Sequence, residues 1–221
     1  MPLTTISLDF WGTLVRANPA FQRAKVGLVH QYFHAGLDPH EVAQTQKAVK
    51  LHYDCLVEAW GIQPNQSMLF ADWLNQLGIT PEKHPPGLLA RFMADYQATA
   101  SQLPAQPYDD HTNAILQDLA ARFRLVLISN TLFVSGATIR GWLAALGWSD
   151  YFAQVIFSDE ADFAKPDARI FALSNHPIHT HIGDNPRTDA FGAQKAGLSF
   201  IGINGPYHHT LSDAYRILAH D

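Results

Sequence analysis

A long block of helical periodicity separates one short strand-like segment from the rest of the chain, and this arrangement limits the possible folds most. Apolar and small polar residues alternate over 3–8 and then meet Asp9 and the turn-forming Gly12, a pattern typical of a strand that ends in a loop. From 19 to about 100, apolar residues instead recur at helical spacing. Glycines and prolines divide this block into four expected helices, with breaks at 36–39, 61–64 and 78–86.

Helix and strand patterns alternate in the remaining chain. Near-continuous apolar runs predict strands over 124–129, 154–157, 178–182 and 198–203. Helices are expected over 112–123, 134–146, 186–196 and 210–219, with a short one after Pro166. Strands that alternate with helices form parallel sheets covered on both faces. We therefore expect an α/β fold with a doubly wound, Rossmann-like parallel sheet. Its core domain comprises 1–15 and 101–221, and 16–100 form an inserted all-helical domain.

The charge of the chain limits its partners. The sequence has 15 basic and 20 acidic residues, a net charge of −5, and no run of lysine or arginine, so it does not indicate a nucleic-acid partner. Residues 16–99 hold seven basic and seven acidic residues, which places the whole acidic excess in the sheet domain. That distribution favours a bound cation.

The expected location is cytoplasmic. The longest apolar runs, such as 125–128, are far shorter than the ~20 residues of a membrane span, and the first four residues, Met-Pro-Leu-Thr, do not resemble a signal peptide. The single cysteine, Cys55, fits a reducing compartment and excludes a cysteine-based metal cage. The sequence indicates no membrane partner and no particular oligomeric state.

Polar groups follow the predicted strands where each one ends. They are Asp9, the run 129–131, Lys165, and the pair Asp184 and Asp189. Ligands of such sheets bind at the carboxyl ends of the strands. Carboxylates can hold a divalent cation, a hydroxyl and backbone amides can hold phosphate oxygens, and a lysine can balance the charge of a transferring phosphoryl group. One carboxylate remains to act as a nucleophile.

Four segments in this order resemble the haloacid dehalogenase (HAD)-like hydrolase superfamily. They are Leu8-Asp9-Phe10-Trp11-Gly12-Thr13-Leu14, Leu127-Ile128-Ser129-Asn130-Thr131, Ala164-Lys165-Pro166-Asp167 and Ile182-Gly183-Asp184-Asn185-Pro186-Arg187-Thr188-Asp189. Each motif is weak alone, and the four together at strand ends are specific. The helical block also falls where members of the superfamily carry a helical cap, between the first and second motifs.

The resemblance implies a role for each matching residue. Asp9 is the expected nucleophile, which forms an aspartyl intermediate, and Lys165 orients it, contacts the substrate and neutralises charge. The transferring group is expected to be held by Ser129, Asn130, Thr13 and the loop after Asp9, at Trp11 and Gly12. A magnesium ion is expected to be bound by Asp9, Asp184, the carbonyl of Trp11 and, directly or through water, Asp189.

Trp11 departs from the pattern of the phosphatases. They usually carry a second aspartate at this position, which protonates the leaving group and then activates water, and an indole can do neither. A general acid or base contributes on the order of 10²–10⁴ in rate, so its loss disfavours alkoxide leaving groups. We expect Trp11 to point toward the cap or the leaving group.

Three functions remain open from the sequence. Retention of Gly183, Asp184 and Asp189 favours a Mg²⁺-dependent phosphatase of a small phosphorylated metabolite, because dehalogenases generally lack this acidic set. The missing general acid would also suit a phosphoryl-binding or sensing protein with little turnover. Dehalogenation of a 2-haloacid or phosphonate hydrolysis is the third reading. The latter would need an imine-forming lysine in the cap, for which Lys25, Lys47 and Lys50 are available.

Overall fold

The core is a five-stranded parallel sheet in the order β5-β4-β1-β6-β7. The computed structural model describes residues 3–33 and 36–220, so residues 1–2, 34–35 and 221, which fall inside the ranges predicted for core and cap, lie outside the described part. The strands are β1 (Thr5–Leu8), β4 (Arg124–Ser129), β5 (Phe152–Phe157), β6 (Ile178–Gly183) and β7 (Ser199–Gly202). The predicted fold class is confirmed, and β1 occupies the centre of the sheet.

Alternate residues of β4 enter two different hydrophobic clusters, because successive side chains of a strand point to opposite faces. Leu125 and Leu127 belong to the larger cluster, and Val126 and Ile128 to the smaller one. The larger cluster includes residues of α5 (Thr112–Arg122), α6 (Gly136–Ala145) and α10 (Leu211–His220). Residues of α8 (Arg169–Ala172) enter the smaller cluster, and α9 (Phe191–Lys195) contacts β7. Helices therefore cover both faces of the sheet.

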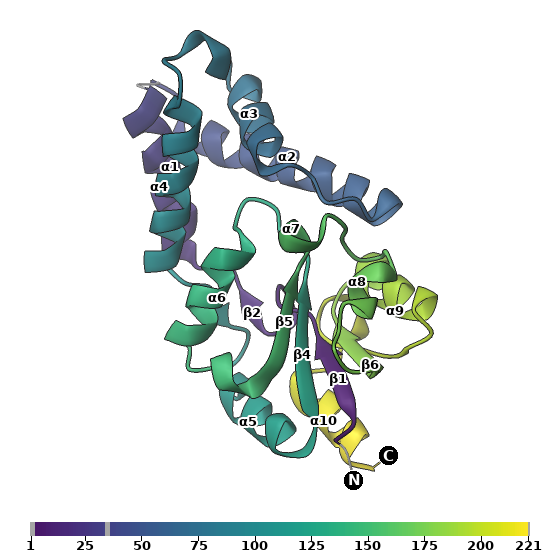
Figure 1. Ribbon diagram of the computed structural model, residues 1–221. Coiled ribbons are helices and arrows are strands. Elements are labelled where there is room, and N and C mark those ends of the chain that lie inside the picture. The colour runs from purple at the N-terminus through teal and green to yellow at the C-terminus, as the bar shows by residue number, and fades with distance from the viewer. Residues whose placement is uncertain (1–2, 34–35, 221) are drawn as a thin grey trace.

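Four helices form the inserted block, as the sequence predicts. They are α1 (Pro19–Phe33), α2 (Pro39–Trp60), α3 (Gln66–Gln76) and α4 (Leu88–Gln102). Side-chain caps explain where two of them begin, since Asp38 and Asn65 accept hydrogen bonds from the first turns of α2 and α3. Tyr96 packs edge to face against both Phe70 and Trp73 in the interior of the block. Figure 1 shows the four helices together at one end of the sheet, with α2 lying across it.

The chain enters and leaves the helical block through two paired strands. β2 (Val15–Arg16) and β3 (Gln106–Pro107) form a short antiparallel sheet of their own. This pairing was not predicted from the sequence, because two-residue strands carry no periodicity. The two connections are thus held side by side at the base of the insertion.

Some boundaries differ from the predicted ones. The helix expected over 186–196 is a π-helical turn (Pro186–Ala190) followed by α9, and the turn begins where Asn185 Oδ1 accepts from two backbone N–H groups. The helix expected from 134 begins two residues later, after the cap Ser135. Short elements were not predicted: η1 (Pro81–Lys83), η2 (Ser149–Tyr151), α7 (Ser158–Ala161) and η4 (Gly205–Tyr207).

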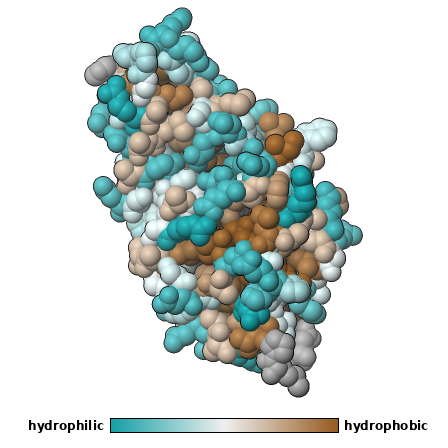
Figure 2. All heavy atoms as spheres, in the orientation of Figure 1, coloured by the Kyte–Doolittle hydropathy of each residue, from teal (hydrophilic) through white to brown (hydrophobic). Residues whose placement is uncertain are grey.

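The surface is mixed in character. Figure 2 shows hydrophobic residues gathered near the middle of one face, with hydrophilic residues around them. Within the described residues, none of the helices is both long enough and apolar enough to cross a membrane.

Candidate active site

Asp9 follows the central strand and stands at the carboxyl edge of the sheet. Its backbone N–H donates to the carbonyl of Ile182 on β6, which continues the strand pairing by one residue. The chain then turns tightly at Gly12, whose φ of +75° is a conformation that suits glycine. A Cβ at position 12 would collide with the carboxylate of Asp184. Glycine therefore lets the loop after Asp9 approach the strand end of β6 closely.

Lys165 uses all three of its ammonium hydrogens. Its Nζ lies 2.6 Å from Asp9 Oδ1, 2.6 Å from Asp189 Oδ1 and 2.9 Å from the carbonyl of Ile128. The side chain is 1% exposed. Burial opposes its charged form, but Asp189 and Asp9 outweigh burial and raise the pKa of Lys165. Lys165 is therefore a fixed positive charge between two carboxylates.

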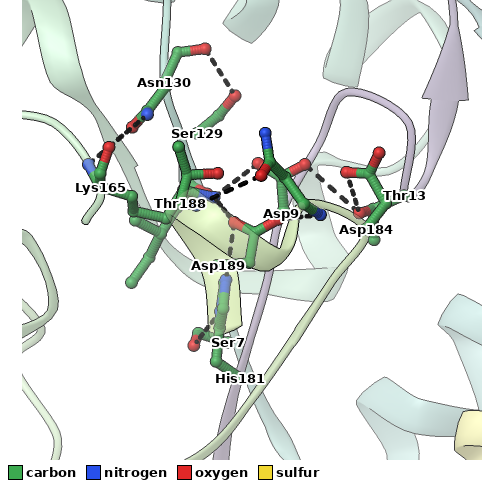
Figure 3. A network of polar contacts seen from close by, with 12 residues as sticks. Ser7, Asp9, Thr13, Ser129, Asn130, Lys165, His181, Asp184, Thr188 and Asp189 are labelled. Atoms are coloured by element: carbon green, nitrogen blue, oxygen red, sulfur yellow. Dashed lines mark hydrogen bonds and ion pairs between the residues drawn. The ribbon is translucent and has the colours of Figure 1, made fainter. Parts of the chain in front are cut away.

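Three carboxylates converge at this edge. One oxygen from each of Asp9, Asp184 and Asp189 lies within 4.8 Å of the others, and Thr13 Oγ1 lies 3.3 Å from Asp9 Oδ2 and 3.4 Å from Asp184 Oδ1 (Figure 3). Oxygen clusters of this kind are what hard divalent cations bind. The sheet thus brings Asp9 beside two carboxylates of a segment that follows more than 170 residues later in the sequence.

The electrostatics of the three carboxylates differ. Burial raises the pKa of Asp9 to about 7 against the opposing effect of Lys165, and burial with Asp189 raises the pKa of Asp184 to about 6. Burial also acts on Asp189, but Lys165 and His181 hold its pKa well below the usual range. The single positive charge of Lys165 therefore does not neutralise all three carboxylates. The donor set fits a divalent cation, which would favour the ionised forms of Asp9 and Asp184.

Asp189 has its oxygens occupied by the protein itself. Oδ1 contacts Lys165 and lies 3.3 Å from His181 Nε2, while Oδ2 accepts from the backbone N–H of Asn185 at 2.9 Å. The contacts show that Asp189 holds Lys165 in place. Its predicted part in metal binding stays a prediction.

A buried hydrogen-bond chain behind the site was not predicted from the sequence. Ser7 Oγ and His181 Nδ1 lie 2.8 Å apart, and His181 Nε2 continues to Asp189. Burial lowers the pKa of His181, so the neutral ring donates from Nε2 to Asp189 and accepts from Ser7. Ser7 and His181 stand opposite each other in the register of β1 and β6, which no local pattern reveals.

The side chain of Asn130 holds the backbone of Lys165 in place. Its amide group pairs with the backbone of Lys165 on both sides, because Nδ2 donates to the carbonyl and Oδ1 accepts from the N–H, each at 2.8 Å. Ser129 is buried beside it, with Oγ 3.3 Å from the Asn130 carbonyl. These contacts position Lys165. The predicted contacts of both side chains with a transferring group stay predictions.

A cavity of about 770 Å³ lies between the helical block and the sheet edge. Asp9, Asn130, Lys165, Asp184 and Asp189 line its base, and residues of α1 and α2 line the opposite wall. Trp11 also lines it, with its indole edge to face against Phe10 and Trp142. Its neighbour Phe10 is fully buried in the hydrophobic core.

Direct contacts hold the helical block over this cavity. Glu58 on α2 accepts from Asn185 Nδ2 at 3.2 Å and pairs with Arg187 at 3.1 Å, beside the acidic cluster. Three glutamines of the block donate to backbone carbonyls of the loop that follows Asn130: Gln63 to Thr131, Gln66 to Leu132 and Gln97 to Phe133. The structure thus shows the block closed onto the core.

A model of the haloacid dehalogenase-like hydrolase family matches residues 3–197. The chain belongs to this family. The family resemblance predicted from the four motifs is thereby confirmed, and the protein is a hydrolase.

Two curated relatives of this HAD-like hydrolase are named glyceraldehyde 3-phosphate phosphatase. The one from Methanothermobacter thermautotrophicus is 32% identical over 127 residues, which span 54% of each chain. The other, from Methanopyrus kandleri, is 23% identical over 209 residues, covering 91% of this chain and 84% of the relative. The first match thus spans about half the length of that relative.

Solved HAD structures share the fold. A HAD-hydrolase from Bacillus subtilis bound to magnesium superimposes with a TM-score of 0.75 at 18% identity, covering 99% of this chain and 100% of the other. The L-2-haloacid dehalogenase of Xanthobacter autotrophicus superimposes with a TM-score of 0.64 at 16% identity, covering 99% of each chain. A HAD phosphatase from Thermococcus onnurineus superimposes with a TM-score of 0.63 at 18% identity, covering 98% of each chain. Because dehalogenases and phosphatases superimpose comparably, the fold alone does not choose the chemistry.

Proposed function

We propose that this protein is a Mg²⁺-dependent phosphatase of a small phosphorylated metabolite that works through an aspartyl-phosphate on Asp9. The observation that carries the proposal is the acidic cluster of Asp9, Asp184 and Asp189 around Lys165 at the base of the cavity. A dehalogenase releases a halide and has no need of such a cluster.

The residues of the site have separate roles in this proposal. Asp9 attacks the phosphorus atom, so that a carboxylate–phosphorus bond forms while the bond to the leaving oxygen breaks, and water then hydrolyses the acyl phosphate. Lys165 favours the ionised form of Asp9 and neutralises charge on the phosphoryl oxygens. Thr13, Ser129, Asn130 and the amides of the loop at Trp11 and Gly12 hold the phosphoryl group.

The metal would be held by Asp9, Asp184 and the carbonyl of Trp11, with Asp189 completing the set through water. A bound Mg²⁺ supplies charge neutralisation to the phosphoryl group and the attacking carboxylate. The raised pKa values of Asp9 and Asp184 support this assignment, because both side chains gain from a further positive charge.

The helical block acts as a cap in this proposal. Residues 16–100 close over the core formed by 1–15 and 101–221, exclude water and contact the leaving group. The names of the two curated relatives make glyceraldehyde 3-phosphate the first substrate to assay.

The test is phosphate release from a panel of alkyl, acyl and enol phosphates, with Mg²⁺ and with a chelator. Release that depends on Mg²⁺ and is lost in Asp9→Asn supports the proposal. Absence of metal-dependent release from every compound overturns it. Halide release from a 2-haloacid in the presence of chelator would instead establish a dehalogenase.

Trp11 favours one second candidate, a phosphoryl-binding protein with little turnover. Its indole occupies the position at which the phosphatases carry their general acid, and it is held by Phe10 and Trp142. A phosphate adduct on Asp9 that persists for hours after mixing with acetyl phosphate would support this candidate. Rapid decay of the adduct would support the phosphatase.

A further inference from the structure

Lys25 is a largely buried lysine in the cap-side wall of the cavity, opposite the acidic cluster. It lies on α1 and is 8% exposed, so more than nine-tenths of the residue is buried. Lys25 lines the same cavity as Asp9 and Lys165. A lysine is almost never buried to this extent unless an anion pairs with it.

Within the described part of the chain, the side chain of Lys25 makes no hydrogen bond and no ion pair. Its charged neighbour is another cation, Lys50 of α2, which is itself occupied by Asp54 at 2.6 Å. Burial and Lys50 lower the pKa of Lys25 to about 8, and a group with that pKa is still mainly protonated at pH 7. The folded protein therefore keeps a positive charge without a counter-ion inside its cavity, a costly arrangement that a bound anion would relieve.

We propose that Lys25 is a specificity residue that binds a carboxylate at the far end of the substrate's leaving group. The inference rests on the proposed phosphatase function and narrows its substrate class to short phosphate monoesters that carry a carboxylate. A neutral hydroxyl or aldehyde would leave the charge of Lys25 uncompensated. A carboxylate neutralises it and accepts a charge-assisted hydrogen bond.

The surroundings of Lys25 support a short carbon chain between the two anionic ends. Phe21, Tyr96 and Leu103 line the cavity with Lys25, and they offer an apolar wall. Lys47 and Lys50 line it from α2 together with Asp54 and Glu58, and Asp54 is paired with Lys50. A ligand with its phosphoryl group at Asp9 would meet Lys165 and the proposed Mg²⁺ at one end, and its carboxylate would meet Lys25 at the other.

Binding of two phosphonates tests the inference without turnover. 3-Phosphonopropionate and propylphosphonate have the same phosphonate on the same three-carbon chain and differ in a terminal carboxylate or methyl group. Calorimetry at pH 7 with Mg²⁺ would compare their affinities for the wild type, Lys25→Met, Lys25→Arg and Lys83→Met. Lys83 is an exposed lysine of η1, which makes it a matched control.

We expect the wild type to bind the carboxylate compound about 10- to 100-fold more tightly, as a hydrogen bond to a charged group allows. Lys25→Met should reduce this ratio to near one, Lys25→Arg should restore part of it, and Lys83→Met should leave it unchanged. A wild type without the preference, including one that binds neither compound, overturns the inference, as does a ratio that survives in folded Lys25→Met. Because these compounds are not turned over, the result is independent of the phosphate-release assay that tests the proposed function.

Discussion

The ammonium of Lys165 lies 2.6 Å from a carboxylate oxygen of Asp9, and neither side chain is more than 9% exposed. This pair joins the end of the central strand to a loop 156 residues later in the chain. The same ammonium holds Asp189, so one positive charge stabilises two buried carboxylates. The pair is therefore both a structural contact and the means of keeping Asp9 in position.

Lys165→Met should destabilise the protein by about 3–5 kcal/mol, because it leaves two buried carboxylates without their cation. Chemical denaturation of both forms at pH 7 would measure the loss. The exposed control Lys83→Met should change the free energy of unfolding by less than about 0.5 kcal/mol. A loss as small as that of the control would show that Asp9 and Asp189 do not depend on Lys165.

Asp9→Asn should abolish phosphate release while the fold is retained, since the amide keeps the shape of the side chain but is a far weaker nucleophile. Steady-state kinetics with circular dichroism would check this. Asp118→Asn on the exposed face of α5 is the matched control and should be fully active. Undiminished activity in Asp9→Asn would refute the mechanism.

Trp11→Asp should raise the turnover of ordinary alkyl phosphates by part of the ~10²–10⁴ that a general acid supplies, because it puts a carboxylate in the cavity wall beside Asp9. Loss of the indole from its contacts with Phe10 and Trp142 should offset part of the gain. The comparison is kcat for glycerol 3-phosphate in this variant and in Trp60→Asp, which alters a tryptophan that is 71% exposed. Equal rates in the two variants would show that position 11 does not reach the leaving group.

Mg²⁺ should stabilise the folded protein, since the acidic cluster forms only on folding. At a concentration 100-fold above the dissociation constant the gain is about 2.7 kcal/mol, which thermal denaturation would detect. Asp184→Asn should remove most of this shift, and Asp118→Asn should retain it. An equal stabilisation by Mg²⁺ in the wild type and both variants would show that the cation does not bind at the acidic cluster.

The free energy of unfolding should rise with pH between about 8 and 10.5 because of Lys25. Its pKa is about 8 in the folded protein and 10.5 in the unfolded chain, so the unfolded state binds more protons in this window. The full change is on the order of 3 kcal/mol. Lys25→Met lacks this contribution, and it should be more stable than the wild type at pH 7 and lose that advantage by pH 10.5. A constant difference between the two proteins would show that the ammonium is already compensated.

The sequence predicted those parts of the fold and site that depend on local patterns. The buried run of β4 is continuous and apolar, so its carboxyl end at Ser129 could be located without the structure. Contacts between distant segments could not be located in this way. The pairing of Ser7 with His181 needs the register of β1 against β6, and the brace of Asn130 on Lys165 needs a loop 35 residues later. The burial of Lys25 likewise depends on how α1 packs. The apolar residues of α1 have the spacing of an ordinary amphipathic helix, which does not show that a lysine of this helix is buried.

The paired strands β2 and β3 have a consequence for how such a chain can change over time. Val15 lies opposite Pro107 and Arg16 opposite Gln106, so the two ends of the insertion are already neighbours whatever connects them. The entropy of closing a loop grows only slowly with its length, so blocks of very different size could be joined to these strands at similar cost. Asp9, Lys165, Asp184 and Asp189 all lie outside the insertion. The arrangement of these four residues can therefore be inherited unchanged while the inserted segment is lengthened, shortened or exchanged.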